Sequence, residues 1–191
     1  MEEQSKPAAA SEGWKKEAME WLKALVVAGV LVVVIRLFLF SPFIVEGPSM
    51  EPNFHTAERI IVNKIIYDLR APERGEVIVF HTKDRADYIK RVIALPGETV
   101  EVQGDTVFVN GVPLAESYLQ KELDEAAAQG RTYNNKSYGP NTVPEGHVFA
   151  MGDNRSNSLD SRDIGFIPYE EIVGRADVTI WPLDAIGFVS H

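Results

Sequence analysis

The sequence contains no cysteine, which excludes disulfide bonds, thiolate metal sites and a cysteine nucleophile. Its four histidines stand apart from one another, and none belongs to an H-E-x-x-H motif or another paired-ligand spacing. A glycine-rich phosphate loop and the S-x-x-K motif of penicillin-binding-type acylases are also missing. If the chain carries a reactive serine, histidine is therefore not an obvious base for it.

The net charge is −9, and none of it comes from the N-terminal part of the chain. Residues 1–42 hold 5 Lys and Arg against 5 Asp and Glu, so the remaining 14 basic and 23 acidic residues give residues 43–191 the whole −9. An acidic domain disfavours binding to polyanions. We therefore expect no nucleic-acid partner.

Charges are scarce between Ala24 and Phe40, where Arg36 alone interrupts the apolar run. As a helix, this run would rise about 26 Å, close to the roughly 30 Å of a bilayer core. A cleavable secretory signal has a shorter run and a small-x-small exit, and a buried soluble helix would be shorter or amphipathic. We predict a disordered cytoplasmic tail over residues 1–20, a transmembrane anchor over 21–41 and an extracytoplasmic domain over 42–191.

Basic residues set the expected orientation of this anchor. Lys15, Lys16 and Lys23 lie before or at the start of the run, whereas the twenty residues after Phe40 contain only Arg59. The positive-inside rule then places the N-terminus in the cytoplasm. We expect a single-pass protein of the cell membrane, with the lipid bilayer as one partner.

Residues 42–191 show many short strand patterns separated by turns. The sequence predicts a short strand at 43–47, a hairpin over 99–114 and a short acidic helix over 118–130; further strands are expected at 59–67, 77–82, 87–95, 147–153 and 170–183. Little helix and frequent turns favour a mainly β, antiparallel fold.

Ser49 lies in the stretch EGPSMEP, between residues that restrict the backbone. It is either an aimed nucleophile or a turn residue. A lysine can serve as its base only if burial lowers the lysine pKa from its usual 10.4 or so. Lys90 and Arg91 interrupt the apolar strand DYIKRVIAL. The alternative is an edge strand with two solvated charges.

The stretch GDNRSNSLDSRD, residues 152–163, is dense in turn-forming and charged side chains. It is either a polar surface turn held by local hydrogen bonds or a functional loop. In the second interpretation Asp153 or Asp160 satisfies an arginine, and a hydroxyl holds the base lysine.

Taken together, PSMEP, DYIKRVIALPGE and GDNRSNSLDSR, in this order behind one anchor, resemble the bacterial type I signal peptidases, in their single-span Gram-positive-like form. The resemblance runs from about Trp21 to Leu183. It implies an antiparallel-sheet catalytic domain related to the repressor autoproteases. It also implies a membrane-bound serine endopeptidase that removes signal peptides from secreted preproteins, cleaving after small residues (Ala-x-Ala) through an acyl-enzyme, with no metal or cofactor.

The resemblance also assigns roles to individual residues. Ser49 matches the nucleophile and Lys90 the general base, with Ser158 hydrogen-bonded to that base. Asp153 matches the partner of Arg91, and the same supporting shell contains Asp160 and Arg162.

The implied oxyanion donors are the Ser49 backbone N–H and a group at Gly47, where two-span members carry a serine. The positions that match the substrate pockets are Phe43, Val45, Met50, Tyr88 and Ile89.

Three other functions remain open. A repressor autoprotease would share the dyad but would carry a DNA-binding N-terminus. A conjugation-type processing peptidase would use the same dyad on one dedicated substrate. A membrane-anchored binding domain without activity would be marked by loss of Ser49 or Lys90, and both are present.

Overall fold

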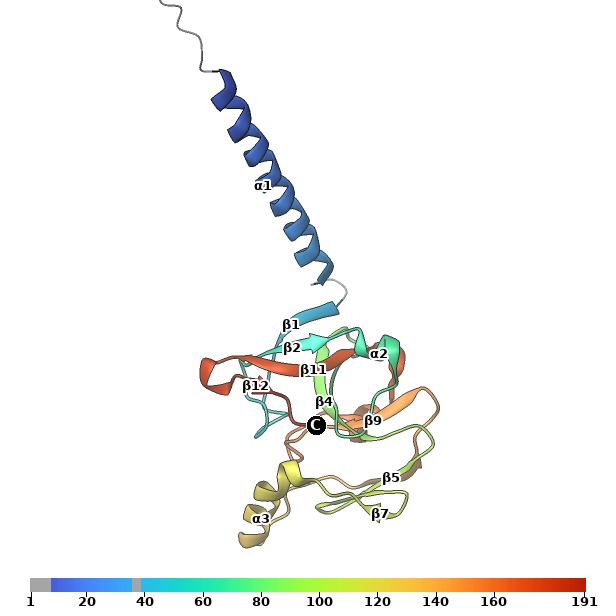
Figure 1. Ribbon diagram of the computed structural model, residues 1–191. Helices are drawn as coiled ribbons and strands as arrows, with labels where there is room; N and C mark the ends of the chain where they lie inside the picture. The colour runs from blue at the N-terminus through green and yellow to red at the C-terminus, as the bar shows by residue number, and fades with distance from the viewer. Residues whose placement is uncertain (1–7, 36–38) are drawn as a thin grey trace, which may run out of the picture. The chain divides into compact units, whose positions relative to one another are not determined.

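The computed structural model describes residues 8–35 and 39–191, and the chain divides into two units, Met1–Leu39 and Phe40–His191. The first unit contains helix α1, Ala8–Val34 (Figure 1), which begins inside the segment predicted to be a disordered tail. Residues 1–7 of that tail, and Arg36, lie outside the described residues. No helix in the described part of the chain is both long and apolar enough to cross a membrane.

The second unit contains two antiparallel sheets. The larger sheet has the strand order β1-β2-β11-β3-β4-β9-β10, with β12 paired to β11. Its strands are β1 (Phe40–Ile44), β2 (Arg59–Asn63), β3 (Val77–His81), β4 (Asp87–Ala94), β9 (His147–Met151), β10 (Ile167–Pro168), β11 (Ile172–Trp181) and β12 (Gly187–Phe188).

The smaller sheet has the order β7-β6-β5-β8. Its strands are β5 (Thr99–Gln103), β6 (Thr106–Val109), β7 (Val112–Pro113) and β8 (Tyr138–Thr142). The helical elements of this unit are short: α2 (Ile66–Leu69), η2 (Ser117–Leu119), α3 (Gln120–Ala128), α4 (Ser161–Ile164), η3 (Tyr169–Glu171) and η4 (Leu183–Ala185). The predicted mainly β, antiparallel fold is therefore confirmed.

Several predicted boundaries differ from the structure. The first strand begins at Phe40 and includes Pro42, which β1 tolerates because it is an edge strand. The strand expected over 59–67 ends at Asn63 and gives way to α2. The turn-rich stretch 139–146 contributes most of β8, the edge strand of the smaller sheet.

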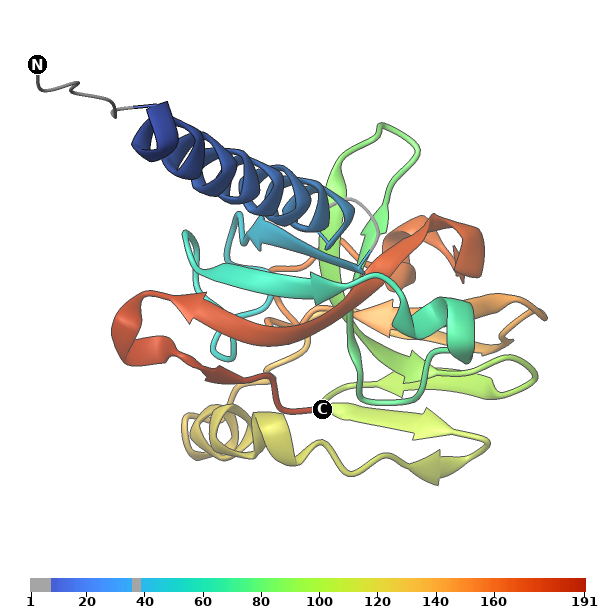
Figure 2. The same cartoon turned by 45° about the horizontal axis from the view of Figure 1, so that its top comes forward.

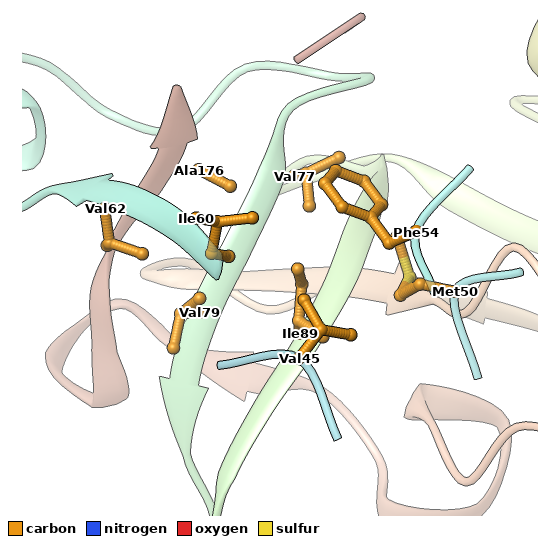
Figure 3. Packing of buried hydrophobic residues seen from close by; sticks show 9 residues of the cluster. All are labelled: Val45, Met50, Phe54, Ile60, Val62, Val77, Val79, Ile89 and Ala176. Carbon is orange, nitrogen blue, oxygen red and sulfur yellow. The ribbon is translucent and has the colours of Figure 1, made fainter. Parts of the chain in front are cut away.

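Strand β4 lies among three hydrophobic clusters, which explains why Lys90 and Arg91 are buried although Asp87, at the start of the strand, is exposed. Ile89 packs with Val79 and other residues of the cluster in Figure 3, Val92 packs in a second cluster, and Ile93 faces the smaller sheet. The last six residues of β4 are all buried. A strand of this kind lacks the alternation of a half-solvated strand.

The two ends of the second unit are built from different elements. Strand β1 lies at one end, and the smaller sheet with α3 lies at the other (Figures 1 and 2). Strand β4 connects the two regions, because it pairs with β3 over Asp87–Arg91 and with β9 from Arg91 onward.

Candidate active site

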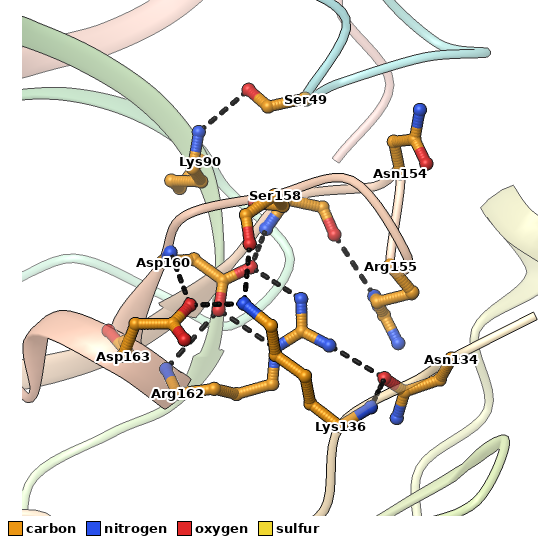
Figure 4. Close-up of polar contacts among 12 residues, drawn as sticks. Ser49, Lys90, Asn134, Lys136, Asn154, Arg155, Ser158, Asp160, Arg162 and Asp163 are labelled. Atoms are coloured by element: carbon orange, nitrogen blue, oxygen red, sulfur yellow. Dashed lines mark hydrogen bonds and ion pairs between the residues drawn. The ribbon is translucent and has the colours of Figure 1, made fainter.

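Ser49 lies in a tight turn after β1. The Glu51 N–H donates to the Pro48 carbonyl over 3.1 Å. Gly47, at the start of the turn, has a φ of +80°, a left-handed conformation that favours glycine. The half-buried Ser49 side chain faces β4, so the turn aims this hydroxyl toward the sheet (Figure 4).

Lys90 meets this hydroxyl from β4. Its Nζ lies 2.8 Å from Ser49 Oγ and donates a second hydrogen bond of 2.8 Å to the Ile89 carbonyl. The Lys90 residue is only 3 % exposed. The alternative of an edge strand with two solvated charges is therefore wrong.

Burial also changes the acidity of Lys90. Removal from water lowers the Lys90 pKa to about 8, from an ordinary value of 10.5. The negative charges of Asp160 and Asp153 oppose this shift, and the positive charge of Arg162 reinforces it. A substantial fraction of Lys90 is then neutral near physiological pH and able to accept a proton.

Arg91, the next residue, forms the ion pair expected with Asp153. Its Nε and one terminal nitrogen donate to the two Asp153 carboxylate oxygens over 3.0 and 2.8 Å. Its other terminal nitrogen donates to the carbonyls of Gly75 and Ser190. Both members of the pair are buried, with bidentate geometry that satisfies the carboxylate.

Asp160 is neutralised in the same way by Arg162. The guanidinium donates to both carboxylate oxygens over 2.8 Å, and the Gly152 N–H adds a bond of 3.0 Å. Although burial alone would raise the Asp160 pKa, these partners hold the pKa below its usual range. Asp160 also caps helix α4, so the loop has a defined shape (Figure 4).

Ser158 does not make the hydrogen bond to Lys90 that the resemblance implies. Its hydroxyl is buried without a well-formed hydrogen bond among the described residues, although it lies close enough to Asp160 to help stabilise that carboxylate. The Lys90 amine is instead held by Ser49 and the Ile89 carbonyl. Ser158 still lies in the site, because it packs against Gly152 beside the Ser49 carbonyl.

A groove of about 650 Å³ runs past the Ser49–Lys90 pair. Among the described strands, β1 pairs only with β2, and residues 87–90 of β4 pair only with β3, so each presents a free edge. The groove is lined by Pro42, Phe43, Ile44, Val45, Glu46, Ser49, Ile60, Val79, Ala86, Asp87, Tyr88, Ile89, Lys90 and Leu159.

Four of the five predicted pocket residues line this groove, and Met50 does not. The Met50 side chain is 0 % exposed and packs in the core with Val45 and Phe54 (Figure 3). The expectation for Met50 is wrong because the turn that aims Ser49 at β4 directs the next side chain inward. Met50 thus fixes the turn to the hydrophobic core.

Sequence reasoning missed the residues that hold the Ser49 turn against the loop 152–163. The Asn154 N–H donates to the Ser49 carbonyl over 3.0 Å, and its side chain donates to the Pro48 carbonyl. A Cβ on Gly152 would lie 2.4 Å from the Ser49 carbonyl oxygen and 2.2 Å from Ser158 Oγ. The signal was present in the G-D-N run, whose glycine is required by this close approach.

A serine hydroxyl within reach of a buried, partly neutral lysine amine is the geometry of a serine peptidase that uses a lysine base. The model of the signal peptidases, peptidase family S26, matches residues 18–181. The chain belongs to this family.

Two signal peptidases from Bacillus species match most of the chain. A signal peptidase I from Bacillus licheniformis is 39 % identical over 90 % of this chain and 93 % of its own length. Signal peptidase I T from Bacillus subtilis strain 168 is 42 % identical over 87 % of this chain and 86 % of its own length. A crystal structure of a signal peptidase I from Enterococcus faecalis V583 covers 56 % of this chain and 97 % of that one, with 35 % identity and a TM-score of 0.49.

Proposed function

We propose that this protein removes signal peptides from secreted preproteins, with Ser49 as the nucleophile and Lys90 as its general base. The observation that carries the proposal is the 2.8 Å contact between Lys90 Nζ and Ser49 Oγ inside a buried site. Membership of the signal peptidase family supports the substrate class.

The neutral Lys90 amine accepts the Ser49 proton through its lone pair while one of its N–H groups stays bonded to the Ile89 carbonyl. The Ser49 oxygen attacks the scissile carbonyl, the Lys90 ammonium gives its proton to the nitrogen of the leaving amine, and the acyl-enzyme forms as the mature protein departs. Lys90, neutral again, then takes a proton from water, the resulting hydroxide hydrolyses the ester, and the proton returns to the Ser49 oxygen. The Ser49 backbone N–H is the proposed oxyanion donor, with Gly47 at the second position.

Burial is the main reason why the Lys90 pKa is low, and two buried ion pairs limit the opposing effect of the nearby carboxylates. Asp153 and Asp160 would each raise the Lys90 pKa. Arg91 pairs with Asp153 and Arg162 with Asp160, so each carboxylate has a guanidinium beside it. We assign Ser158 a positioning role next to the base, since its buried hydroxyl still has hydrogen-bonding capacity to offer.

The free edges of β1 and β4 suit an extended substrate, whose backbone would complete the hydrogen bonds that both edges leave open. The groove leaves room for small side chains next to the cut, and it is lined by Phe43, Val45, Tyr88 and Ile89.

We expect a preprotein whose signal ends in Ala-x-Ala to be cleaved after the second alanine. A matched preprotein with leucine in that last position should be cleaved at least about tenfold more slowly, because a single extra methylene in a pocket already shifts discrimination by roughly 10–200-fold and leucine adds more than one carbon to alanine. Equal rates, measured on gels with the product N-terminus sequenced, would contradict the small-residue specificity.

We further propose that the N-terminal unit anchors the protein in the cell membrane with residues 42–191 outside. The apolar run 24–40, the lysines before it, and the exposed side chains of residues 14–35 support this proposal, since exposed apolar surface on this scale is unfavourable in water.

Protease added to intact protoplasts tests this topology. We expect residues 42–191 to be degraded and an epitope fused ahead of Met1 to be spared, with both parts degraded after detergent lysis. Degradation of the epitope with protection of the catalytic domain would reverse the orientation, and release of the whole chain into the soluble fraction would exclude the anchor.

A further inference from the structure

Tyr118 covers the Arg91–Asp153 pair from a part of the chain that the proposed mechanism does not use. Its ring lies under the Arg91 guanidinium, with 4.1 Å between the guanidinium carbon and the ring centroid. A cation over an aromatic face at this distance is attracted to it, and the attraction is strongest where water is excluded. Arg91 is therefore held by Asp153 on one side and by an aromatic ring on another.

The ring is itself held in place by a second buried ion pair. The Tyr118 hydroxyl donates to Glu116 over 2.6 Å, and Glu116 also accepts 2.7 Å from Arg155. Glu116 and Arg155 are both buried, and the Arg155 Nε donates to the Gly152 carbonyl. Burial and the Glu116 charge raise the Tyr118 pKa, so the hydroxyl stays protonated and can keep donating.

Two more contacts fasten the same segment to the active-site loop. The Tyr133 hydroxyl donates to the Asp153 carbonyl over 2.8 Å. The Asn53 side chain donates to the Tyr118 carbonyl and to the Asp153 carboxylate. The segment 116–133 includes η2 and α3, the second of which is labelled in Figure 1. It is thus tied to Asp153 and Arg155 at separate points.

We infer that Tyr118 is a positioning residue for the catalytic base, acting through Arg91, and that the segment 116–133 serves as a cap that keeps the Arg91–Asp153 pair closed. The inference rests on the proposed function, because it concerns the same lysine. Tyr118 does not touch the substrate groove. Its effect reaches Lys90 only through the position of Arg91 and the exclusion of water.

The direction of this effect follows from the charges around the base. A weaker hold on Arg91 leaves Asp153 less compensated, and the field of Asp153 raises the Lys90 pKa. Water entering beside the pair would also stabilise the ammonium form, so both consequences have the same sign. The charged or titratable groups that act on Lys90 or Arg91 are Asp153, Asp160, Arg162, Tyr88, Tyr118 and His191. Glu116 and Arg155 act on Tyr118 itself.

The test is the pH dependence of kcat/KM for preprotein cleavage by the detergent-solubilised full chain. In Tyr118→Leu the acid side of the pH profile of kcat/KM should shift to higher pH by roughly one unit. At pH 7 kcat/KM should then be about tenfold lower than in the wild type, and it should recover at higher pH. Tyr118→Phe keeps the ring under Arg91 and should retain the wild-type pH profile on the acid side. Tyr138→Leu is the matched control, because Tyr138 lies on β8 of the smaller sheet, where its ring packs against Phe149 of the larger sheet and is not among the groups that act on Lys90 or Arg91.

The inference would be overturned if the pH profile of Tyr118→Leu coincided with that of the wild type on the acid side. Equal shifts in the profiles of Tyr118→Leu and Tyr138→Leu would overturn it as well. Thermal melts establish folding, and Tyr118→Met, whose longer unbranched side chain adapts better to an irregular gap, replaces the leucine variant if that variant does not fold. If the wild type fails to cleave the preprotein, the proposed function fails instead. The effect of Tyr118 on Lys90 is then measured by NMR titration of the lysine, where an unchanged pKa would still overturn the inference.

Discussion

Replacing Lys90 by arginine should abolish preprotein cleavage at every pH. A guanidinium remains protonated across the accessible range and cannot accept the Ser49 proton. A positioned general base contributes roughly 10²–10⁴ in rate, and a loss of at least this size is expected. The wild type should behave differently: its kcat/KM should rise about tenfold per pH unit on the acid side and level off above about 8, because the neutral form of Lys90 grows as pH passes its pKa.

The controls for this variant separate base catalysis from charge and from folding. Lys90→Met removes the base without introducing a buried cation, and it should be folded and equally inactive. Lys83→Arg makes the same chemical change on the exposed turn between β3 and β4, and it should cleave like the wild type. Cleavage by Lys90→Arg at a rate near that of the wild type would show that another group is the base.

Ser49→Ala should reduce cleavage to background while leaving the protein folded. The hydroxyl is half-buried in a turn whose backbone bonds do not depend on it, so the change in unfolding free energy should be small. Without the oxygen no acyl-enzyme can form. Cleavage is followed with the Ala-x-Ala preprotein, and the exposed Ser156→Ala serves as the matched control. Substantial turnover by Ser49→Ala, with an unchanged cleavage site, would exclude Ser49 as the nucleophile.

Local patterns predicted most of the strands and marked Ser49 and Lys90 as candidates, whereas their roles as nucleophile and base came from the family resemblance. The run DYIKRVIAL predicted both strand β4 and a lysine surrounded by apolar side chains, because these depend on neighbours in sequence. The Arg91–Asp153 pair joins residues 62 positions apart, and it was expected only from the family resemblance. The burial of Met50 depends on the direction in which a turn enters the core, which composition does not reveal.

The role of the segment 116–133 was beyond sequence reasoning for a different reason. Its acidic helix is a weak local pattern, and nothing in YLQKELDEAAAQG indicates that Tyr118 lies under Arg91. Glu116 and Arg155 likewise become partners only when the fold brings η2 to the loop 152–163. Ser158 shows the opposite case, in which the resemblance implies a hydrogen bond that the structure replaces with a bond from Lys90 to the Ile89 carbonyl.

The central claim is that Lys90 is a base because its buried amine loses its proton near neutral pH. NMR titration of the full chain, with lysines carrying ¹³C at the Cε position, measures this pKa without reference to activity. The Lys90 resonance is identified as the one missing from Lys90→Met. The account predicts a pKa of about 8 for this amine, with Lys83 as the exposed reference in the same spectra. A Lys90 pKa near the ordinary 10.5 would contradict it, because the lysine would then be protonated whenever Ser49 is required to react.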